Sequence, residues 1–346
     1  MDKSFIKSKL AAAPEFDCIR KHDFNRCTLF FTVNNRTRFE QVKHVGGTSI
    51  LMSYEYLRKS LKFYENEMLP WITDNNGLFM TDSGVFSFIS PRSMREEKND
   101  PEYWIPYIEE YVQFLYDNRE HIYCAANFDL DFIVGPDKVD EWNEKYFKPL
   151  LDHINIVPIV HQFYKHDHYG FNRLRQYASE GYDYIGIASS ISMRQHIQKY
   201  AQEAKRLNVR LHGFGFTEYG PVVNNPLFSI DSSSWTMGSR YGESHFDSGR
   251  DFLRRNMDFH HFRKHYKKRI IDMGIDYENV SSRRANDYNV NVFNLHGWLR
   301  FYKSYLESGN IKLPNYPTTF YRKELKEVDL PDFYVPSKER TFVKMK

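Results

Sequence analysis

The chain has 346 residues, 41% of them hydrophobic and 27% charged, which predicts a packed core and excludes a largely disordered protein. Its three cysteines are too few and too dispersed for a disulfide framework, and no apolar run approaches the roughly 18–20 residues of a membrane span. The net charge of +3 is a weak indication of a polyanionic partner, and an aromatic content of 17% suits stacking on bases. Because the N-terminus lacks a signal-peptide core, we expect a soluble, cytoplasmic protein.

Short apolar runs alternate along the chain with stretches of helical spacing. Eight runs are expected to form strands, at 48–53, 77–81, 121–128, 154–160, 184–188, 209–214, 227–230 and 289–293. Helices are expected at 54–69, 101–118, 136–151, 192–207 and 295–306, with Pro70 ending the first and Ser192 capping the fourth. This alternation is typical of parallel strands that are joined by helical crossovers.

Eight such strands predict an α/β fold, a (β/α)8 TIM-type barrel with Thr28–Val33 as an extra N-terminal strand outside the barrel. A doubly wound parallel sheet is the competing architecture. We expect one domain, residues 1–346, with an irregular lead-in over 1–27. Its parts would be a core at about 46–306, a basic insertion at about 240–288 before the last strand, and an extended C-terminal arm at about 311–346.

Polar residues and glycines stand at or just after the ends of the predicted strands. They are Asp82, Asp129, His161, Gly186, His212 and Asp231. In a parallel barrel all these strand ends open on one mouth, so the residues would meet there. Two carboxylates at one mouth can act as a nucleophile and as a general acid and base. Each residue also has a structural interpretation: an Asp-Ser-Gly turn for Asp82, a helix cap for Asp231, and hydrogen-bonded rim residues for the histidines.

Seven segments, in the same order, resemble the tRNA-guanine transglycosylases, which exchange a guanine base for a 7-deazaguanine. They are Thr81–Phe86 (TDSGVF), Ala126–Asp129 (ANFD), Pro158–Gln162 (PIVHQ), Tyr184–Ala188 (YIGIA), Leu211–Gly215 (LHGFG), Phe228–Asp231 (FSID) and Asn294–His296 (NLH). The sequences HGFGF at 212–216 and SIDSSSW at 229–235 look most like the phage-type branch, which places 7-deazaguanines in DNA.

The resemblance implies a role for each matching residue. Asp231 would attack C1′ of the target nucleotide and form a covalent glycosyl-enzyme, and Asp82 would exchange protons with the leaving and entering bases. The implied substrate-binding residues are Ser83, Phe86, Asp129, His161, Gln162, Gly186, His212 and Gly213. Among these, Phe86 and His212 would enclose the base, and Asp129, Gly186 and one of His161 or Gln162 would contact its edges.

The chain departs from the family pattern at two places. Gly84-Val85 stands where the family has two glycines, which would narrow the pocket or change its preference. The family's zinc site needs three clustered cysteines and a histidine, but no cysteine follows Cys124 and Phe293 stands where the family has the ligand histidine. A tetrahedral thiolate site cannot be built from these residues, so we expect no zinc and no other cofactor.

The segment between Asp231 and Asn289 is basic, and aromatic residues alternate with its cations. Its candidate nucleic-acid-binding residues are Arg240, Arg254, Arg255, Arg263, Lys264, Lys267, Lys268 and Arg269. Such a pattern suits phosphate contacts and single-strand stacking, and it also suits an amphipathic helix with a solvated basic face.

We therefore expect an enzyme that replaces guanine in DNA with a 7-deazaguanine such as 7-cyano-7-deazaguanine. DNA and the free base would be its partners, a membrane would not, and a protein partner or homo-oligomer stays open. The alternatives are the same exchange on tRNA, a non-catalytic nucleic-acid-binding subunit, and a barrel glycoside hydrolase. The missing zinc site and RNA-binding module argue against exchange on tRNA. The presence of both Asp82 and Asp231 argues against a non-catalytic subunit, and the lack of a Glu at any strand end argues against a glycoside hydrolase.

Overall fold

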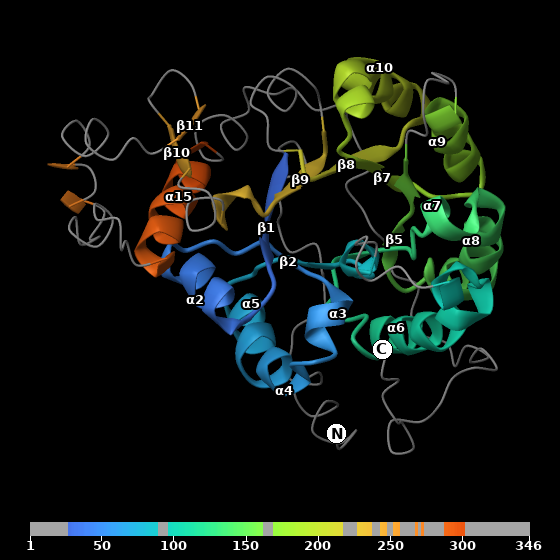
Figure 1. Ribbon diagram of the computed structural model, residues 1–346, viewed down its shortest axis with the longest axis horizontal. Coiled ribbons are helices and arrows are strands. Elements are labelled where there is room, and N and C mark those ends of the chain that lie inside the picture. The colour runs from blue at the N-terminus through green and yellow to red at the C-terminus, as the bar shows by residue number, and fades with distance from the viewer. Residues whose placement is uncertain are drawn as a thin grey trace.

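The computed structural model describes residues 27–88, 96–161, 169–216, 227–236 and 287–301, with short segments at 243–247, 252–256, 267–268 and 271–272. Its centre is a sheet of parallel strands in the order β5-β4-β3-β2-β1-β9-β8-β7-β6, with helices around it (Figure 1). The strands are β1 (Thr28–Val33), β2 (Ile50–Met52), β3 (Phe79–Thr81), β4 (Cys124–Ala126), β5 (Asn155–Val157), β6 (Ile159–Val160), β7 (Tyr184–Ala188), β8 (Arg210–Phe214) and β9 (Ser229–Ser232).

The two ends of this strand order are joined by a single residue, Pro158. β5 pairs with β4 and β6 pairs with β7, so one interrupted strand connects both ends of the sheet. Proline has no N–H to donate, but the Pro158 carbonyl accepts a hydrogen bond from Gly186 N–H at 2.9 Å. On the other side the Asn127 side chain accepts the Ile159 N–H at 3.1 Å. The sheet therefore forms a nearly closed barrel, which confirms the predicted α/β TIM-type fold.

Two sequence-based assignments of strands are wrong. Thr28–Val33 does not lie outside the barrel: β1 lies between β2 and β9, with Phe31 opposite Ile50 and Phe30 opposite Asp231. The predicted strand at 289–293 is instead part of helix α15 (Asp287–Phe301). A short apolar run fits both the two-residue repeat of a strand and the 3.6-residue repeat of a helix. Here Val290 and Phe293 are both buried at a helical spacing of three. The barrel core thus begins near residue 28 rather than 46.

Helices lie between the strands and cover the outside of the barrel (Figure 1). They include α2 (Arg36–His44), α6 (Ile105–Asp117), α7 (Asp131–Val134), α8 (Pro136–Trp142), α9 (Tyr169–Ser179) and α10 (Ile191–Leu207). The cap of α10 is Ser190, whose hydroxyl accepts the Met193 N–H at 3.0 Å, rather than the predicted Ser192. No helix in the described part of the chain is long and apolar enough to cross a membrane.

The predicted helix at 54–69 is divided into shorter pieces. They are α3 (Tyr54–Leu57), α4 (Leu61–Phe63), a π-helical turn (Tyr64–Met68) and α5 (Leu69–Asp74). Pro70 lies in the first turn of α5 instead of ending a helix. Pro70 has no N–H to donate to a helical carbonyl, and the wider π-helical turn just before α5 lies where the regular α-helical hydrogen bonds are interrupted.

The barrel interior is filled by a compact group of side chains that is separate from the larger core under the helices. This group consists of Phe30, Leu51, Leu78, Met80, Tyr123, Cys124, Val157, Tyr184 and Phe228. In β1, Phe30 points into the barrel while its neighbours Leu29 and Phe31 pack toward the helices. Burial raises the pKa of the Cys124 thiol well above its usual range, so it is an inert part of this core.

Candidate active site

Asp82 follows β3 directly and is held by the turn that comes after it. The Gly84 N–H donates to Oδ1 of Asp82 at 2.8 Å. Gly84 has φ +82°, and a Cβ at this position would lie 2.7 Å from both Ser53 Oγ and Glu55 Cβ. Only glycine fits this conformation and this close approach. The turn then presents Phe86, whose side chain is 94% exposed.

The surroundings of Asp82 raise its pKa to about 6. Burial is the largest cause, hydrogen bonds from Ser53 and Gly84 oppose the rise, and the charges of Asp129 and Asp231 add to it. Because β3, β4 and β9 are parallel strands of one sheet, their carboxyl ends lie on the same side of the barrel, which is where the three carboxylates lie. Near neutral pH the group therefore exists in both protonation states, which suits a residue that must give and take a proton.

Asp231 lies on β9, where its carboxylate is buried and oriented by neighbouring strands. The Thr32 hydroxyl of β1 donates to Oδ2 at 2.9 Å, and the Gly215 N–H after β8 donates to Oδ1 at 2.8 Å. His212 Nε2 lies 3.4 Å from Oδ1. Gly215 has φ +66°, which turns its N–H toward the carboxylate. These donors fix the direction of both carboxylate oxygens, as a nucleophile requires.

A histidine–carboxylate pair forms another part of the mouth. Asp129 Oδ2 lies 3.0 Å from His161 Nε2, and the ring of Phe132, which is 54% exposed, packs edge-on against His161 with 4.8 Å between ring centroids. Burial alone would lower the pKa of His161, but the Asp129 and Asp131 carboxylates raise it overall. Burial raises the pKa of Asp131 to about 6.

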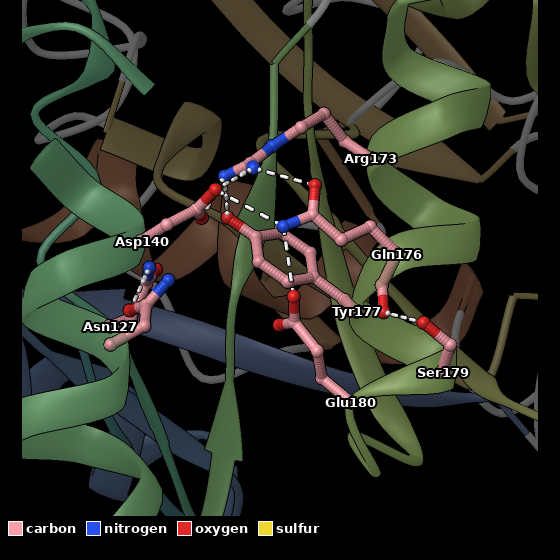
Figure 2. A network of polar contacts seen from close by, with 8 residues as sticks. Asn127, Asp140, Arg173, Gln176, Tyr177, Ser179 and Glu180 are labelled. Carbon is pink, nitrogen blue, oxygen red and sulfur yellow. Dashed lines mark hydrogen bonds and ion pairs between the residues drawn. The ribbon is translucent and has the colours of Figure 1, made fainter. Parts of the chain in front are cut away.

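A polar network connects the helices behind this pair. Figure 2 shows Arg173 of α9 between Asp140 of α8 and the hydroxyl of Tyr177. Its guanidinium donates to both Asp140 oxygens, at 2.5 and 2.6 Å, and to Gln176 at 2.9 Å. The Arg173 charge opposes the rise in the pKa of His161 and that of Asp131. A two-point contact of this kind fixes α8 against α9 and thereby supports the Asp129–His161 side of the mouth.

Several predicted substrate-binding residues have packing roles in the free protein. The Ser83 hydroxyl accepts the Val85 N–H at 3.4 Å, and its carbonyl accepts the Tyr107 hydroxyl at 2.6 Å. At Gly186 a Cβ would lie 2.5 Å from the Phe214 ring, and at Gly213 it would lie 2.9 Å from the Phe216 ring. Both glycines therefore make room for an aromatic ring.

His212 lies beside Asp231 but is covered from solvent in the free protein. Its side chain is fully buried and packs against Phe214, with 4.3 Å between ring centroids. In this conformation the ring is covered by its neighbours, and its stacking on a base stays a prediction. Phe214, which is half-buried, lies nearer the solvent at the same strand end.

Several predicted residues cannot be placed by the described part of the chain. Gln162, Arg240, Arg263, Lys264 and Arg269 lie outside the described residues. Arg254 and Arg255 belong to β11 (Phe252–Asn256), which pairs antiparallel with β10 (Glu243–Asp247). Lys267 and Lys268 are exposed. Their contact with nucleic acid stays a prediction.

Thr32 and Phe132 are site residues that sequence reasoning missed. Thr32 lies on the strand that was expected outside the barrel, so its contact with Asp231 could not be foreseen. Phe132 follows Asp129 by three residues, and an exposed aromatic after a strand-terminal carboxylate could have indicated it. Among the described residues, no group of three or more His, Cys, Asp or Glu side chains is arranged to hold a metal ion.

Comparisons with known proteins identify no family for this chain. A scan against models of protein families finds no match, and a search of curated proteins finds no similar one. The solved structures that match include thiamine phosphate pyrophosphorylase from Pyrococcus furiosus, at 13% identity and a TM-score of 0.37. The match covers 63% of this chain and 90% of that chain. These comparisons add no support for the resemblance to the tRNA-guanine transglycosylases.

Proposed function

We propose that this protein exchanges a guanine base in DNA for a 7-deazaguanine, such as 7-cyano-7-deazaguanine, through a covalent intermediate on Asp231. The observation that carries the proposal is the contrast between two carboxylates at one barrel mouth. Asp82 has a pKa of about 6, whereas Asp231 is oriented by donors from two other strands. A pair of carboxyl groups in unlike surroundings is the arrangement that divides acid–base work from nucleophilic work.

In the first displacement, a carboxylate oxygen of Asp231 attacks C1′ of the target nucleotide. The new C1′–O bond replaces the C1′–N9 bond, whose electron pair leaves with the guanine. Asp82 in its protonated form gives its proton to the departing base, so the base leaves neutral. The product is a glycosyl ester of Asp231, and Asp82 is left as a carboxylate.

In the second displacement, the Asp82 carboxylate removes the N9 proton of the entering 7-deazaguanine. N9 then attacks C1′, and the electrons of the C1′–O bond return to Asp231. Both residues regain their starting states, and two displacements give net retention at C1′. A pKa of about 6 supports both tasks near neutral pH, because neither protonation state of Asp82 is rare. We propose no cofactor, since these side chains account for every transfer.

Side chains around the carboxylates would recognise the base. The exposed ring of Phe86, four residues after Asp82 in the sequence, would offer a stacking surface. Asp129 accepts hydrogen bonds only, which suits the N1–H and 2-amino donors of guanine and of its 7-deaza analogues. His161 holds the Asp129 carboxylate at 3.0 Å and so fixes the direction in which it accepts.

The choice of DNA over tRNA rests on the sequence. It comes from the phage-type form of residues 212–235, the missing zinc ligands and the basic segment that follows Asp231. Because a duplex hides C1′ and the base edges, the target nucleotide must leave the stack, which costs a few kcal/mol. Exposed aromatic side chains at the mouth would offset part of this cost.

The test is incubation of the purified chain with 7-cyano-7-deazaguanine and guanine-containing duplex DNA, single-stranded DNA or tRNA, followed by nucleoside mass spectrometry. We expect a 7-deazaguanine deoxynucleoside from DNA. Product from tRNA alone would overturn the choice of substrate and keep the chemistry. If none of the three nucleic acids is modified, or if Asp231→Ala exchanges the base as fast as the parent, the proposed function is wrong. Asp137→Asn, an exposed carboxylate on α8, is the matched control.

A further inference from the structure

A buried chain of hydrogen bonds runs through the barrel interior and ends at Asp231. The Tyr184 hydroxyl of β7 bonds the Ser229 hydroxyl of β9, and Ser229 Oγ lies 2.7 Å from His212 Nδ1 of β8. The other ring nitrogen, Nε2, lies 3.4 Å from Asp231 Oδ1. Tyr184, Ser229 and His212 have no solvent-exposed surface. The chain thus connects three neighbouring strands to the carboxylate.

We propose that His212 is a positioning residue whose neutral Nε2–H tautomer is set by Tyr184 and Ser229, and that it donates to Asp231 Oδ1 during the exchange. The proposal rests on the proposed function, in which Asp231 is the nucleophile. It differs from the stacking role that the resemblance implied for His212.

Hydrogen-bonding capacity decides the direction of this chain. Burial raises the pKa of Tyr184 well above its usual range, so its hydroxyl keeps a proton to donate. If Tyr184 donates to Ser229, the Ser229 proton goes to His212 Nδ1, and the ring must carry its own proton on Nε2.

The opposite direction ends on a poorer acceptor. Tyr184 would then have to donate to the neighbouring Cys124 sulfur, which is a weak acceptor. In the proposed direction the last acceptor is the Asp231 carboxylate, which is a strong one. The acceptor at the end of the chain therefore favours an Nε2–H that points to Asp231.

The contact from His212 to Asp231 is not yet a full hydrogen bond. At 3.4 Å it is long, and Nε2 has no other partner among the described residues. A buried donor without a partner is unfavourable, so any movement that brings the carboxylate closer is favoured. Catalytic hydrogen bonds are often long in free enzymes and shorten once substrate binds.

The donors also distinguish the two oxygens of Asp231. Oδ1 accepts from Gly215 and faces His212, whereas Oδ2 accepts from Thr32 alone. Oδ2 has more free lone-pair density and is therefore the oxygen that bonds to C1′. Oδ1 becomes the ester carbonyl. When the second displacement releases Asp231, the electron pair of the C1′–Oδ2 bond returns to Oδ2, and the carboxylate shares the negative charge with Oδ1. The His212 N–H would stabilise that charge as it develops.

The kinetic test compares His212→Gln with His212→Asn. Glutamine places an amide nitrogen near the position of Nε2, and asparagine places one near Nδ1. We expect His212→Asn to lose about 100-fold in kcat and His212→Gln to lose no more than about 10-fold, with little change in KM for the free base. Equal losses in both variants, with thermal unfolding like that of the parent, would overturn the positioning role.

A spectroscopic test needs no activity. In the ¹⁵N-histidine spectrum of the intact protein, the His212 signals, assigned by their loss in His212→Gln, should show a bare Nδ1 and a protonated Nε2. Tyr184→Phe should disturb this pattern, and Tyr64→Phe, which removes another buried phenol, should not. A proton on Nδ1 would overturn the tautomer.

These two tests separate the failures. If the parent protein exchanges no base on any nucleic acid, the proposed function fails, while the spectrum still decides the tautomer. If the parent is active and His212→Asn retains its full rate, the function stands and the role of His212 is wrong.

Discussion

The two candidate catalytic carboxylates are held by different means. Asp82 depends mainly on nearby chain: Gly84, two residues later, donates to its carboxylate, Ser53 directly after β2 adds a hydrogen bond, and its loop packs on the start of α3. Asp231 depends on distant chain: Thr32 lies 199 positions away in sequence, and Gly215 lies after a different strand. One carboxylate is shaped by a turn and the other by the closure of the barrel.

This difference corresponds to the two tasks. A general acid and base needs a pKa near the working pH, and burial in a tight turn supplies it for Asp82. A nucleophile needs a fixed direction, and a donor on β1 together with a donor directly after β8 supplies it for Asp231. The molecule therefore separates the control of proton affinity from the control of geometry.

The largest effect is expected from Asp231→Asn, which keeps the shape of the side chain and removes the nucleophile. We expect exchange to fall by about 10⁴-fold or more. No covalent protein–DNA complex should survive denaturation before electrophoresis. Asp137→Asn should behave as the parent. A trapped complex in Asp231→Asn would assign the nucleophile to another residue.

Asp82→Asn should slow exchange by about 10³-fold, because proton transfer to and from the base is lost while the nucleophile remains. Unlike Asp231→Asn, this variant should still form a small amount of covalent complex over long incubation. The amount of covalent complex, measured over time, compares the two residues directly. If both variants form the complex equally, the assignment of Asp231 as nucleophile and Asp82 as acid and base is wrong.

The same substitution should also change the pH dependence of stability. The pKa of Asp82 is raised from 3.8 to about 6, so between these values the folded state holds a proton that the unfolded state has lost. Stability should therefore fall as pH rises through this window and stay lower above it, by at most about 3 kcal/mol.

Asp82→Asn lacks this carboxyl and should not show the fall. Urea unfolding of parent and variant at pH 4, 6 and 8 measures the difference. From pH 4 to pH 6 the free energy of unfolding of the variant should rise relative to that of the parent. If the difference in unfolding free energy between parent and variant is the same at all three pH values, burial does not penalise the charged form of Asp82.

The barrel and the ends of its strands could be predicted because both depend on local pattern. Apolar runs that alternate with helical spacing indicated parallel strands, and Asp82, Asp129 and Asp231 could be placed at strand ends from their position in the chain. The segment 289–293 could not be told from a helix, because five residues are too few to distinguish the two-residue repeat of a strand from the 3.6-residue repeat of a helix.

The details of the site could not be predicted, because they depend on which strands become neighbours. Nothing in Thr28–Val33 indicates that it closes the barrel beside β9, so the Thr32–Asp231 bond was not foreseen. The burial of His212 also depends on which strands become neighbours in the barrel. Its place in β8 was correct, but whether its side chain faces the interior or the solvent depends on how the barrel is closed.

The smallest effect is expected from the support of Asp231. Thr32→Val keeps the shape of the side chain and removes the donor to Oδ2, so we expect a loss of about 10-fold in kcat, as for one hydrogen bond to a charged group. Thr32→Ser keeps the hydroxyl and should stay within about 2-fold of the parent.

Thr81→Val provides the matching test on the other carboxylate. Thr81 precedes Asp82, but its hydroxyl contacts the Asp82 carbonyl at 3.4 Å and not the carboxylate. If Asp82 is held by Gly84 and Ser53 and not by the side chain of its own strand, Thr81→Val should leave the rate unchanged while Thr32→Val lowers it. A large loss in Thr81→Val would mean that side chains of the strand also orient Asp82. The local support of one carboxylate and the long-range support of the other would then no longer be distinct.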